Sequence, residues 1–324
     1  MKYTGKKTSL ILCAAGISLL ISGCGAGSAV TSFEKENYNK SIYEAELFAE
    51  DLCVTDSDVS ISGFEGDSSL HAEGLFDLTD HTVEYGYNLF ERLLSGKYHK
   101  DLTSLVAIKK FRYGRCRHCR RNAADVKCFG WEDQVCGLQE GDQLTMRDLL
   151  YGLLLWSGND NAVAIAEHVG GDVDTFMEMV NDQAAELMAT GTHFVTPNGL
   201  HDPDHYTTAY DLYLIFNECI KHEEFMDIIS ASSYTANVTG ADGTARQLTW
   251  EPTNYYARGA AALPEGATVI GGKTGYTGDA GDCLVLLCEN DSGDQYISIV
   301  MGAADKPTLY EDMTALIDQI PSLE

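Results

Sequence analysis

The sequence predicts an α+β protein in which one mixed sheet is built from both ends of the chain. Two strand-like segments lie near the start, three lie near the end, and helical patterns fill the stretch between them. This order implies that the first and last segments of the sheet meet in space. The helical stretch between them is then an insert in an α+β architecture.

The early strands form a predicted hairpin, because residues 75–78 and 82–85 flank the turn Thr79-Asp80-His81. A helix over residues 102–108 follows. The late strands are the short apolar run 267–270 and the stronger runs 283–288 and 296–301.

Helices are predicted over most of the middle of the chain. Residues 145–156 are nearly all apolar, Asp160 or Asn161 can cap the helix that follows, and residues 173–190 carry one apolar face. A helix over residues 208–221 comes after the turn-rich segment 191–200, and a last helix is expected over 309–320.

Composition limits the partners of the protein. The 324 residues are 44% hydrophobic and 22% charged, which is typical of a globular protein. A formal charge of -27 argues against nucleic acid and against attachment to anionic lipid, since both require clustered Lys and Arg.

The first 24 residues have the pattern of a signal peptide: three early lysines, an apolar core too short to span a bilayer, and the small pair Ser22-Gly23. The end, Leu20 to Cys24, resembles the lipobox of bacterial lipoproteins, in which the cysteine is lipidated. A plain secretory signal is the alternative. Residues 25–60, rich in Ser, Gly, Asp and Glu, are expected to be a tether.

Neither group of metal-ligand residue types favours a metal site. Cys116, Cys119, Cys128 and Cys136 have unequal spacings that match paired zinc ligands poorly. The histidines at 193, 201 and 205 lie in a loop rich in Pro, Asn and Asp, where turn residues are the simpler interpretation. The sequence therefore predicts no metal.

Two short motifs suggest where the chemistry lies. Lys273-Thr274-Gly275 ends a predicted strand and offers an ammonium, a hydroxyl and a backbone edge without a side chain to a small anionic substrate. Ser157-Gly158-Asn159 ends an apolar helix. Together they make two of the three motifs of penicillin-binding proteins and serine β-lactamases, and the third is Ser-Xaa-Xaa-Lys.

From residue 75 to residue 305 the chain resembles the D-alanyl-D-alanine carboxypeptidases of peptidase family S11, the low-molecular-weight penicillin-binding proteins. The matching segments, in order, are 90–93, 103–107, 157–162, 192–194, 197–200, 206–209 and 273–277, followed by Ala280-Gly281. The resemblance implies a β-lactamase/transpeptidase-like fold with a mostly antiparallel five-stranded sheet, flanking helices and an all-helical subdomain. The domain is then residues 61–324, with the helical insert at about 125–225.

The resemblance also implies an activity and the residues for it. The family removes the terminal D-alanine of peptidoglycan stem peptides through an acyl-enzyme on its motif serine, needs no cofactor and reacts with β-lactam antibiotics. Lys100 takes the position of the motif lysine that activates the serine. Ser157 is expected to relay the proton to the leaving amine, and Asn159 to bind substrate backbone or hold the lysine. Lys273, Thr274 and Gly275 are expected to bind the substrate carboxylate and backbone. The protein would work on the outer face of the cell membrane, anchored through lipid on Cys24.

The chain departs from the family at the nucleophile. The family motif Pro-Ala-Ser-Xaa-Thr-Lys-Ile falls on residues 95–101, where this chain reads Ser-Gly-Lys-Tyr-His-Lys-Asp, so Lys97 stands in place of the serine. Ser95 is two residues too early to share a helical face with Lys100. One codon choice for this segment, read in a shifted frame, spells Pro-Ala-Ser-Ile-Thr-Lys-Ile.

A second segment, residues 109–121, permits the same interpretation. It holds seven of the 22 Lys and Arg residues, and a shifted reading gives an acidic turn and a strand. The sequence therefore leaves two hypotheses: a carboxypeptidase whose gene sequence contains frame errors, or a lipid-anchored pseudoenzyme that binds stem peptides without cleaving them. Under the first, residues 95–121 should be the least well-formed part of the domain, with 109–121 a solvated loop.

Overall fold

A computed structural model of the chain describes residues 49–94, 99–110, 119–120, 134–200 and 202–322. The chain divides into two units, residues 1–48 and 49–324, and every described residue lies in the second. None of the described helices combines the length and apolar character needed to cross a membrane. The predicted signal peptide and Cys24 lie outside the described residues, as do positions 95–98 and most of 109–121.

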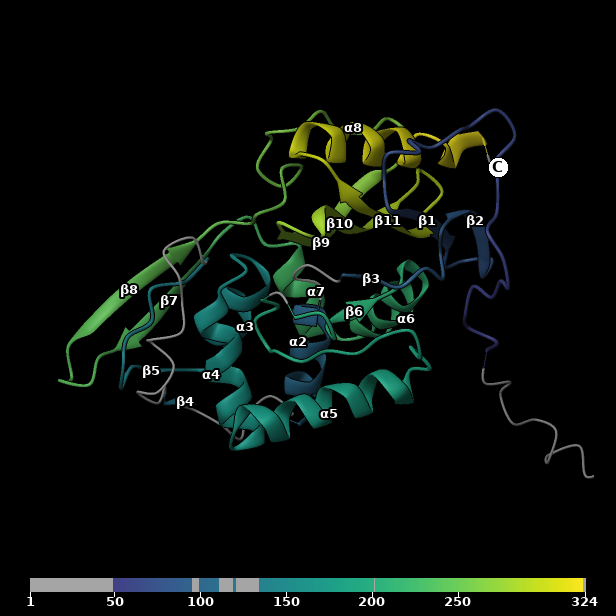
Figure 1. Cartoon of the computed structure of the whole chain (residues 1–324). Helices are drawn as coiled ribbons and strands as arrows, with labels where there is room; N and C mark the ends of the chain where they lie inside the picture. Colours follow the sequence, from purple (N-terminus) through teal and green to yellow (C-terminus); the bar gives the residue numbers. More distant parts are fainter. Residues whose placement is uncertain (1–48, 95–98, 111–118, 121–133, 201, 323–324) are drawn as a thin grey trace, which may run out of the picture. The chain divides into compact units, whose positions relative to one another are not determined.

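A five-stranded sheet with the order β2-β1-β11-β10-β9 joins the two ends of this unit (Figure 1). Its strands are β1 (Ala72–Asp77), β2 (Thr82–Tyr87), β9 (Thr268–Thr277), β10 (Gly281–Glu289) and β11 (Gln295–Ala303). Ala72 on β1 faces Met301 on β11, so the early hairpin pairs directly with the late strands as predicted. Every pairing is antiparallel, which makes the sheet antiparallel and not mixed.

Helix α8 (Lys306–Ile317) covers one face of the sheet (Figure 1). Asp305 caps it by accepting a hydrogen bond from the backbone N–H of Thr308, and Pro307 lies in its first turn. Apolar side chains of α8, β10 and β11 form a separate small core on this side, centred on Leu284, Val300 and Met313. A short 3-10 helix, η3 (Ile320–Ser322), follows.

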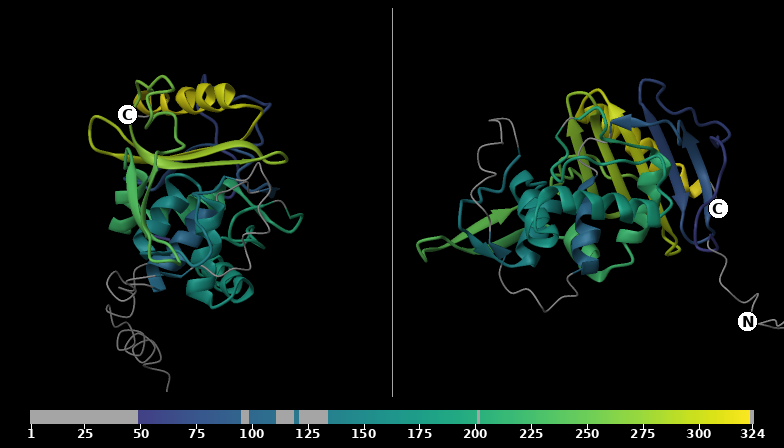
Figure 2. Two further views of the ribbon diagram at one scale, coloured as in Figure 1. Left: turned by 90° about the vertical axis from the view of Figure 1, so that its left-hand side faces the viewer. Right: turned by 60° about the horizontal axis from the view of Figure 1, so that its bottom comes forward.

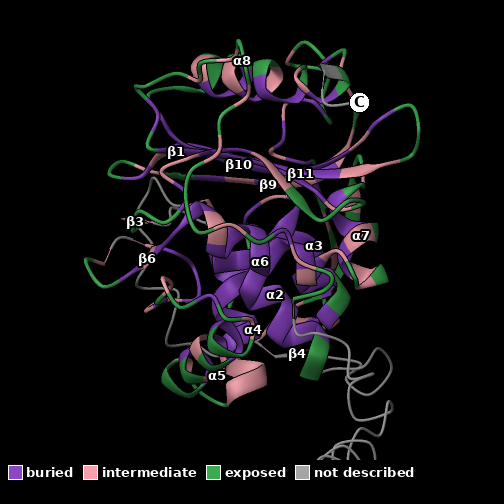
Figure 3. Cartoon of the chain, turned by 90° about the vertical axis from the view of Figure 1, so that its right-hand side faces the viewer, coloured by how far each residue is buried: buried purple, intermediate pink, exposed green. Residues whose placement is uncertain are grey.

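The other face of the sheet packs against the helical layer (Figure 3). This layer contains α2 (His99–Lys110), α3 (Met146–Leu154), α4 (Asn159–Gly170), α5 (Val173–Glu186), α6 (Ala209–Cys219) and α7 (Glu223–Ile229). Helix α2 lies at its centre, in contact with the other five helices, and all its residues from His99 to Ile108 are buried.

Side-chain caps explain where three of these helices begin. Thr145, Asp172 and Thr208 each accept a hydrogen bond from a backbone N–H in the first turn, before α3, α5 and α6 respectively. The prediction that Asp160 or Asn161 caps α4 is wrong, because the cap residue is Gly158. The Asp160 carboxylate is engaged elsewhere, accepting hydrogen bonds from the N–H groups of Cys136 and Leu138.

Two small sheets and one hairpin were not predicted. Strands β3 (Leu93–Leu94) and β6 (Tyr206–Thr207) pair with each other. Strands β4 (Cys119–Arg120), β5 (Gln143–Leu144), β7 (Tyr234–Thr239) and β8 (Ala245–Trp250) form the second sheet. Figure 2 shows the β7–β8 hairpin extending beside the helical layer.

The packed structure begins before residue 60. Cys53 is fully buried, and its N–H donates to the hydroxyl of Tyr213 at 2.7 Å. Val59 pairs with Gly86 through two backbone hydrogen bonds. Residues 52–60, which were predicted to belong to the tether, therefore pack against the domain.

Candidate active site

Lys100 brings the start of helix α2 into contact with the turn between α3 and α4. Its side chain is fully buried, and its Nζ donates to the backbone O of Ser157 at 2.5 Å, to Asn159 Oδ1 at 2.8 Å and to Ser157 Oγ at 3.2 Å. An ammonium without such acceptors would cost several kcal/mol to bury, so these oxygens are what keeps the lysine here.

Ser157 lies between two lysines. Lys273 Nζ donates to its Oγ at 3.1 Å from the sheet side, and Lys100 does so from the helical side. The backbone of Ser157 has φ of 68°, a left-handed conformation that is uncommon for a residue with a side chain. Such strain persists where surrounding contacts fix the backbone, and it is concentrated at functional sites.

Residues 134–138 supply those contacts. The N–H of Asn159 donates to the backbone O of Gln134 at 2.8 Å, and Gln134 Nε2 donates to the backbone O of Trp156 at 2.7 Å. Trp156 Nε1 donates in turn to the backbone O of Val135 at 3.0 Å. Ser157 is thus bracketed on both sides by the same segment.

Gly158 is required by close packing in this turn. A Cβ at this position would lie 2.4 Å from Cys136 Sγ and 2.8 Å from Asn161 Oδ1, which is closer than real Cβ atoms come. Burial raises the pKa of the Cys136 thiol well above its ordinary value, so this cysteine is an uncharged packing group. The Ser-Gly-Asn form of the motif therefore follows from the position of Cys136.

Lys273, Thr274 and Gly275 lie on β9, at the edge of the five-stranded sheet. Lys273 is fully buried, and its Nζ donates to the backbone O of Thr274 at 2.6 Å as well as to Ser157. The hydroxyls of Thr274 and Thr253 share a hydrogen bond of 2.6 Å. One side of β9 pairs with β10, and the other lacks a strand partner among the described residues, so an extended peptide can pair there.

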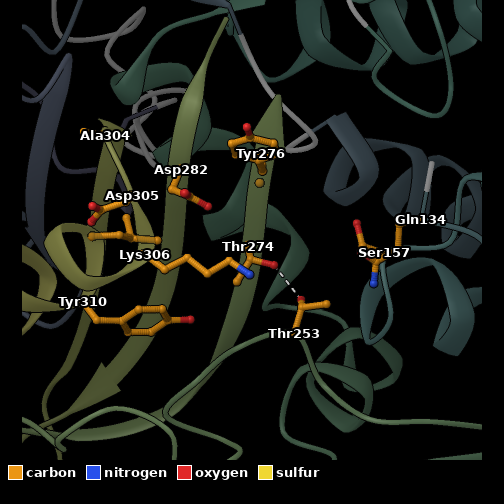
Figure 4. Close-up of a pocket in the computed structure, with 12 residues that line it drawn as sticks. Gln134, Ser157, Thr253, Thr274, Tyr276, Asp282, Ala304, Asp305, Lys306 and Tyr310 are labelled. Atoms are coloured by element: carbon orange, nitrogen blue, oxygen red, sulfur yellow. Dashed lines mark hydrogen bonds between the residues drawn. The ribbon is translucent and has the colours of Figure 1, made fainter. Parts of the chain in front are cut away.

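A pocket of about 540 Å³ opens beside these residues (Figure 4). One end has Ser157, Gln134 and Thr253, and the strand residues Thr274, Gly275 and Tyr276 line the pocket along β9. The other end is lined by Asp282 of β10 and by residues at the start of α8: Ala304, Asp305, Lys306, Leu309 and Tyr310. A volume of this size is ordinary for a small-molecule or peptide site.

The structure brings most of the predicted site residues together. Lys100, Ser157, Asn159 and Lys273 form one hydrogen-bonded group, with Thr274 and Gly275 beside it. Residue 97 and Cys24 lie outside the described residues. Of the loop histidines, His193 contacts the backbone O of Asp204 and His205 accepts from the N–H of Val195, while residue 201 is not described.

Sequence reasoning missed Gln134, Thr253, Asp282, Lys306 and Tyr310. None of them lies in a recognised motif, and the fold alone brings them to the pocket. One signal was available for Lys306: it follows Asp305, which has the type and position of a helix cap after the last strand. Cations in the first turn of a helix oppose its dipole, so a lysine there suggests a role other than helix stability.

A family model for D-alanyl-D-alanine carboxypeptidases, peptidase family S11, matches residues 125–305, more than half of the chain. The chain belongs to this family. D-alanyl-D-alanine carboxypeptidase DacF of Bacillus subtilis is 27% identical to it over 239 residues, which are 73% of this chain and 58% of the relative. DacD of Escherichia coli is 35% identical over 167 residues, 51% of this chain and 39% of the relative. The chain thus spans about two fifths to three fifths of the length of these relatives.

Solved structures of DD-peptidases share the fold. The DD-transpeptidase of Streptomyces K15 superposes with a TM-score of 0.73 at 25% identity, covering 80% of this chain and 99% of that one. A D-alanyl-D-alanine carboxypeptidase from Mycobacterium tuberculosis gives 0.70 at 27% identity, covering 82% and 97%. The β-lactamase/transpeptidase-like fold implied by the sequence motifs is therefore confirmed.

Proposed function

We propose that the gene for this chain encodes a serine-type D-Ala-D-Ala carboxypeptidase that trims the terminal D-alanine from peptidoglycan stem peptides. The observation that carries the proposal is the placement of Ser157 Oγ, held between Lys100 Nζ at 3.2 Å and Lys273 Nζ at 3.1 Å beside an edge strand. A hydroxyl in this position can transfer a proton between a lysine and a reacting atom. The two lysines also make the site suitable for an anionic substrate. Family membership supports the substrate class.

Substrate binding uses the edge of β9. A peptide ending in D-alanyl-D-alanine would lie extended along the open side of the strand and pair with its backbone. Gly275 has no side chain that could obstruct this approach. Its terminal carboxylate would meet the Lys273 ammonium and the Thr274 hydroxyl. Charge-assisted hydrogen bonds of this kind are shorter and stronger than neutral ones.

Bond cleavage needs a nucleophile next to Lys100. The motif serine would add its oxygen to the carbonyl carbon between the two D-alanines and pass its proton to Lys100. Lys100 can accept this proton only in its neutral form, in which Nζ gives up one of its three donated hydrogen bonds. Ser157 would carry a proton to the departing amine as the C–N bond breaks, leaving an acyl-enzyme and free D-alanine. Water would then release the shortened peptide. Asn159 keeps Lys100 in position through its Oδ1.

The serine itself is the missing part, and we propose that residues 95–101 and 109–121 result from frame errors in the gene sequence. Packing of helix α2 supports this for the first segment. His99 and Asp101 are buried in its first turn, and Nδ1 of His99 and Oδ1 of Asp101 have no hydrogen-bond partner among the described atoms. The shifted frame puts threonine and isoleucine at these two positions, and keeps Lys100. Threonine and isoleucine suit a buried helix start better than an imidazole and a carboxylate do.

The alternative function is a pseudoenzyme that binds stem peptides without cleaving them, and Lys97 in place of the serine favours it. A fluorescent penicillin separates the two, because covalent labelling requires the serine hydroxyl. We expect no labelling of this literal chain, and labelling of a chain expressed from resequenced DNA. Resequencing that reproduces the present reading would overturn the frame hypothesis, and labelling of the literal chain would overturn the pseudoenzyme.

Attachment to the outer face of the membrane through lipid on Cys24 is part of the same proposal. It rests on the lipobox-like residues Leu20 to Cys24 and on the division of the chain into signal peptide (1–24), tether (25–60) and domain (61–324). The boundary between tether and domain moves to about residue 52, because Cys53 is buried. Metabolic labelling with an alkyne fatty acid should mark the full chain and not the variant Cys24→Ala. Equal labelling of both proteins would refute the anchor, leaving secretion as the alternative.

A further inference from the structure

The end of the pocket farthest from Ser157 is built differently from the end described above. There the side chains of Asp282, Asp305, Lys306 and Tyr310 surround the space, and Tyr276 lies at the rim with 55% of its surface exposed (Figure 4). The proposed peptide binding along β9 does not use Asp282, Asp305, Lys306 or Tyr310. A pocket of about 540 Å³ also holds more than two alanine residues need.

Asp282 is the group that requires an explanation. Its side chain lines the pocket although the residue is only 7% exposed. Among the described residues, none donates a hydrogen bond to the Asp282 carboxylate or forms an ion pair with it. It lies opposite Tyr276 in the β9–β10 register, which places both side chains on the same face of the sheet. By contrast, Asp305 at the same end caps α8 through the N–H of Thr308.

Lys306 supplies the opposite charge at the same end. It extends from the start of α8 toward Thr274 in Figure 4, with its Nζ 5.1 Å from the centre of the Tyr255 ring. Burial raises the pKa of Asp282, while Lys306 lowers it and Asp305 raises it, so the acid and the ammonium are near enough to interact. They still form no ion pair within 4.0 Å.

We propose that Asp282 and Lys306 form a subsite for the zwitterionic end of an α-amino acid, whose ammonium binds Asp282 and whose carboxylate binds Lys306. The subsite rests on the proposed function, because it extends the peptide site of the same pocket. A carboxylate and an ammonium that face one space without pairing are complementary to an ammonium and a carboxylate on one carbon. Free D-alanine has this end group, and so does a diamino diacid in a peptide when its distal end is unblocked.

Calorimetric titration of the full chain with three probes tests the subsite. The first is an N-acylated tripeptide that ends in D-Ala-D-Ala and begins with a diamino diacid whose distal end is free. The second is the same peptide with the distal amine acetylated, and the third is free D-alanine. Wild type should bind the first peptide about tenfold more tightly than the second, since a hydrogen bond to a charged group contributes about that much.

Asp282→Asn should abolish this preference and leave affinity for the acetylated peptide unchanged. Asp291→Asn, in the exposed turn after β10, is the matched control and should keep the preference. Lys306→Met should weaken both peptides, because both retain the distal carboxylate. If Asp282→Asn also weakens D-alanine, the subsite takes the released amino acid; if only the peptide responds, it takes the peptide side chain.

The results also separate this proposal from the proposed function. Wild type that binds both peptides equally, or an Asp282→Asn variant that keeps the tenfold preference or weakens both peptides alike, would overturn the subsite alone. Failure of wild type to bind either peptide would overturn the peptide site as a whole. Lys273→Met should abolish binding of both peptides whichever holds for Asp282.

Discussion

At the scale of single residues, the site depends on how one strained serine is held. Ser157 has a left-handed backbone, and Trp156 and Asn159 on either side of it are both hydrogen-bonded to Gln134. A left-handed backbone at a residue with a side chain costs on the order of 1–3 kcal/mol, so it needs this support. The support in turn aims Oγ at both lysines.

Gln134→Glu should make peptide binding depend on pH. A protonated glutamic acid can donate to the Trp156 carbonyl as the amide does, but an ionised one cannot and would face that oxygen with a charge. Affinity for an N-acyl-D-Ala-D-Ala peptide should therefore be near that of wild type below the pKa of the new acid and fall by about tenfold above it. Titration calorimetry between pH 4.5 and 8 measures this. Gln139→Glu, at an exposed position, should show no added pH dependence.

Gly158→Ala should destabilise the domain by about 1–3 kcal/mol, because the new methyl group overlaps Cys136 Sγ. Cys136→Gly should relieve most of this overlap, so the double variant should lose less than the sum of the two single variants. Urea unfolding of all four proteins gives the coupling free energy. Strict additivity would show that the turn moves away from Cys136 and that the glycine is not needed for packing.

At the scale of elements, helix α2 carries a conflict in its first turn. Helix α2 packs against helices α3 to α7. Three residues of its first turn are buried at the centre of this packing: His99, Lys100 and Asp101. Lys100 donates to three acceptor oxygens. Burial raises the pKa of Asp101, and although the Lys273 ammonium opposes this, the net value is about 7. Burial lowers the pKa of His99 well below its usual value. His99 is therefore neutral near pH 7, whereas Asp101 passes from its protonated to its ionised form around that pH.

Asp101→Asn should make the domain relatively more stable at pH 8 than at pH 5. The folded-state pKa of about 7 exceeds the unfolded value, so Asp101 contributes stability that is lost as pH rises from about 4 to 7. Asparagine removes that loss, which is on the order of 2 kcal/mol between the two pH values. His99 acts with the opposite sign, but it is present in both proteins and cancels in the comparison. Urea unfolding at both pH values measures the difference, and exposed Asp80→Asn should leave it unchanged. A pH-independent difference would mean that Asp101 is ionised in the folded state.

The elements also show how far the sequence could predict this fold. Helix starts were predictable where a side chain is free to cap, as at Thr145 and Thr208, and the prediction failed at Asp160, whose carboxylate is used by a segment more than twenty residues away. The β7–β8 hairpin was missed because its outward residues are polar and few of its positions are buried. Motifs predicted Ser157 and Lys273, whereas Gln134 and Lys306 reach the pocket only through long-range packing.

At the scale of the whole molecule, the pocket exists because the two ends of the domain share one sheet. Strand β11 pairs with β1 from the start of the domain, β10 pairs with β11, and β9 pairs with β10 at the edge of the sheet. Helix α8 then closes the far end of the pocket. Helix α2 brings Lys100 to the same place from the other layer. Under the proposed function, peptide binding needs only the complete fold, whereas cleavage also needs a serine at position 97.

The chain as written should bind D-Ala-D-Ala peptides but release no D-alanine, and a chain carrying the shifted-frame residues at 95–101 and 109–121 should do both. Loss of the nucleophile in a comparable serine enzyme lowers kcat by about a millionfold, so release by the literal chain should be undetectable in a coupled D-alanine assay. The repaired chain should also take up fluorescent penicillin. A second repaired chain, with alanine in place of the restored serine at position 97, should lose both the label and the release while keeping peptide affinity. Repairing 109–121 alone should restore neither, because it leaves Lys97 in place. A repaired chain that folds and binds peptide yet stays unlabelled would show that the shifted reading does not supply the nucleophile, and the pseudoenzyme would then be the better account.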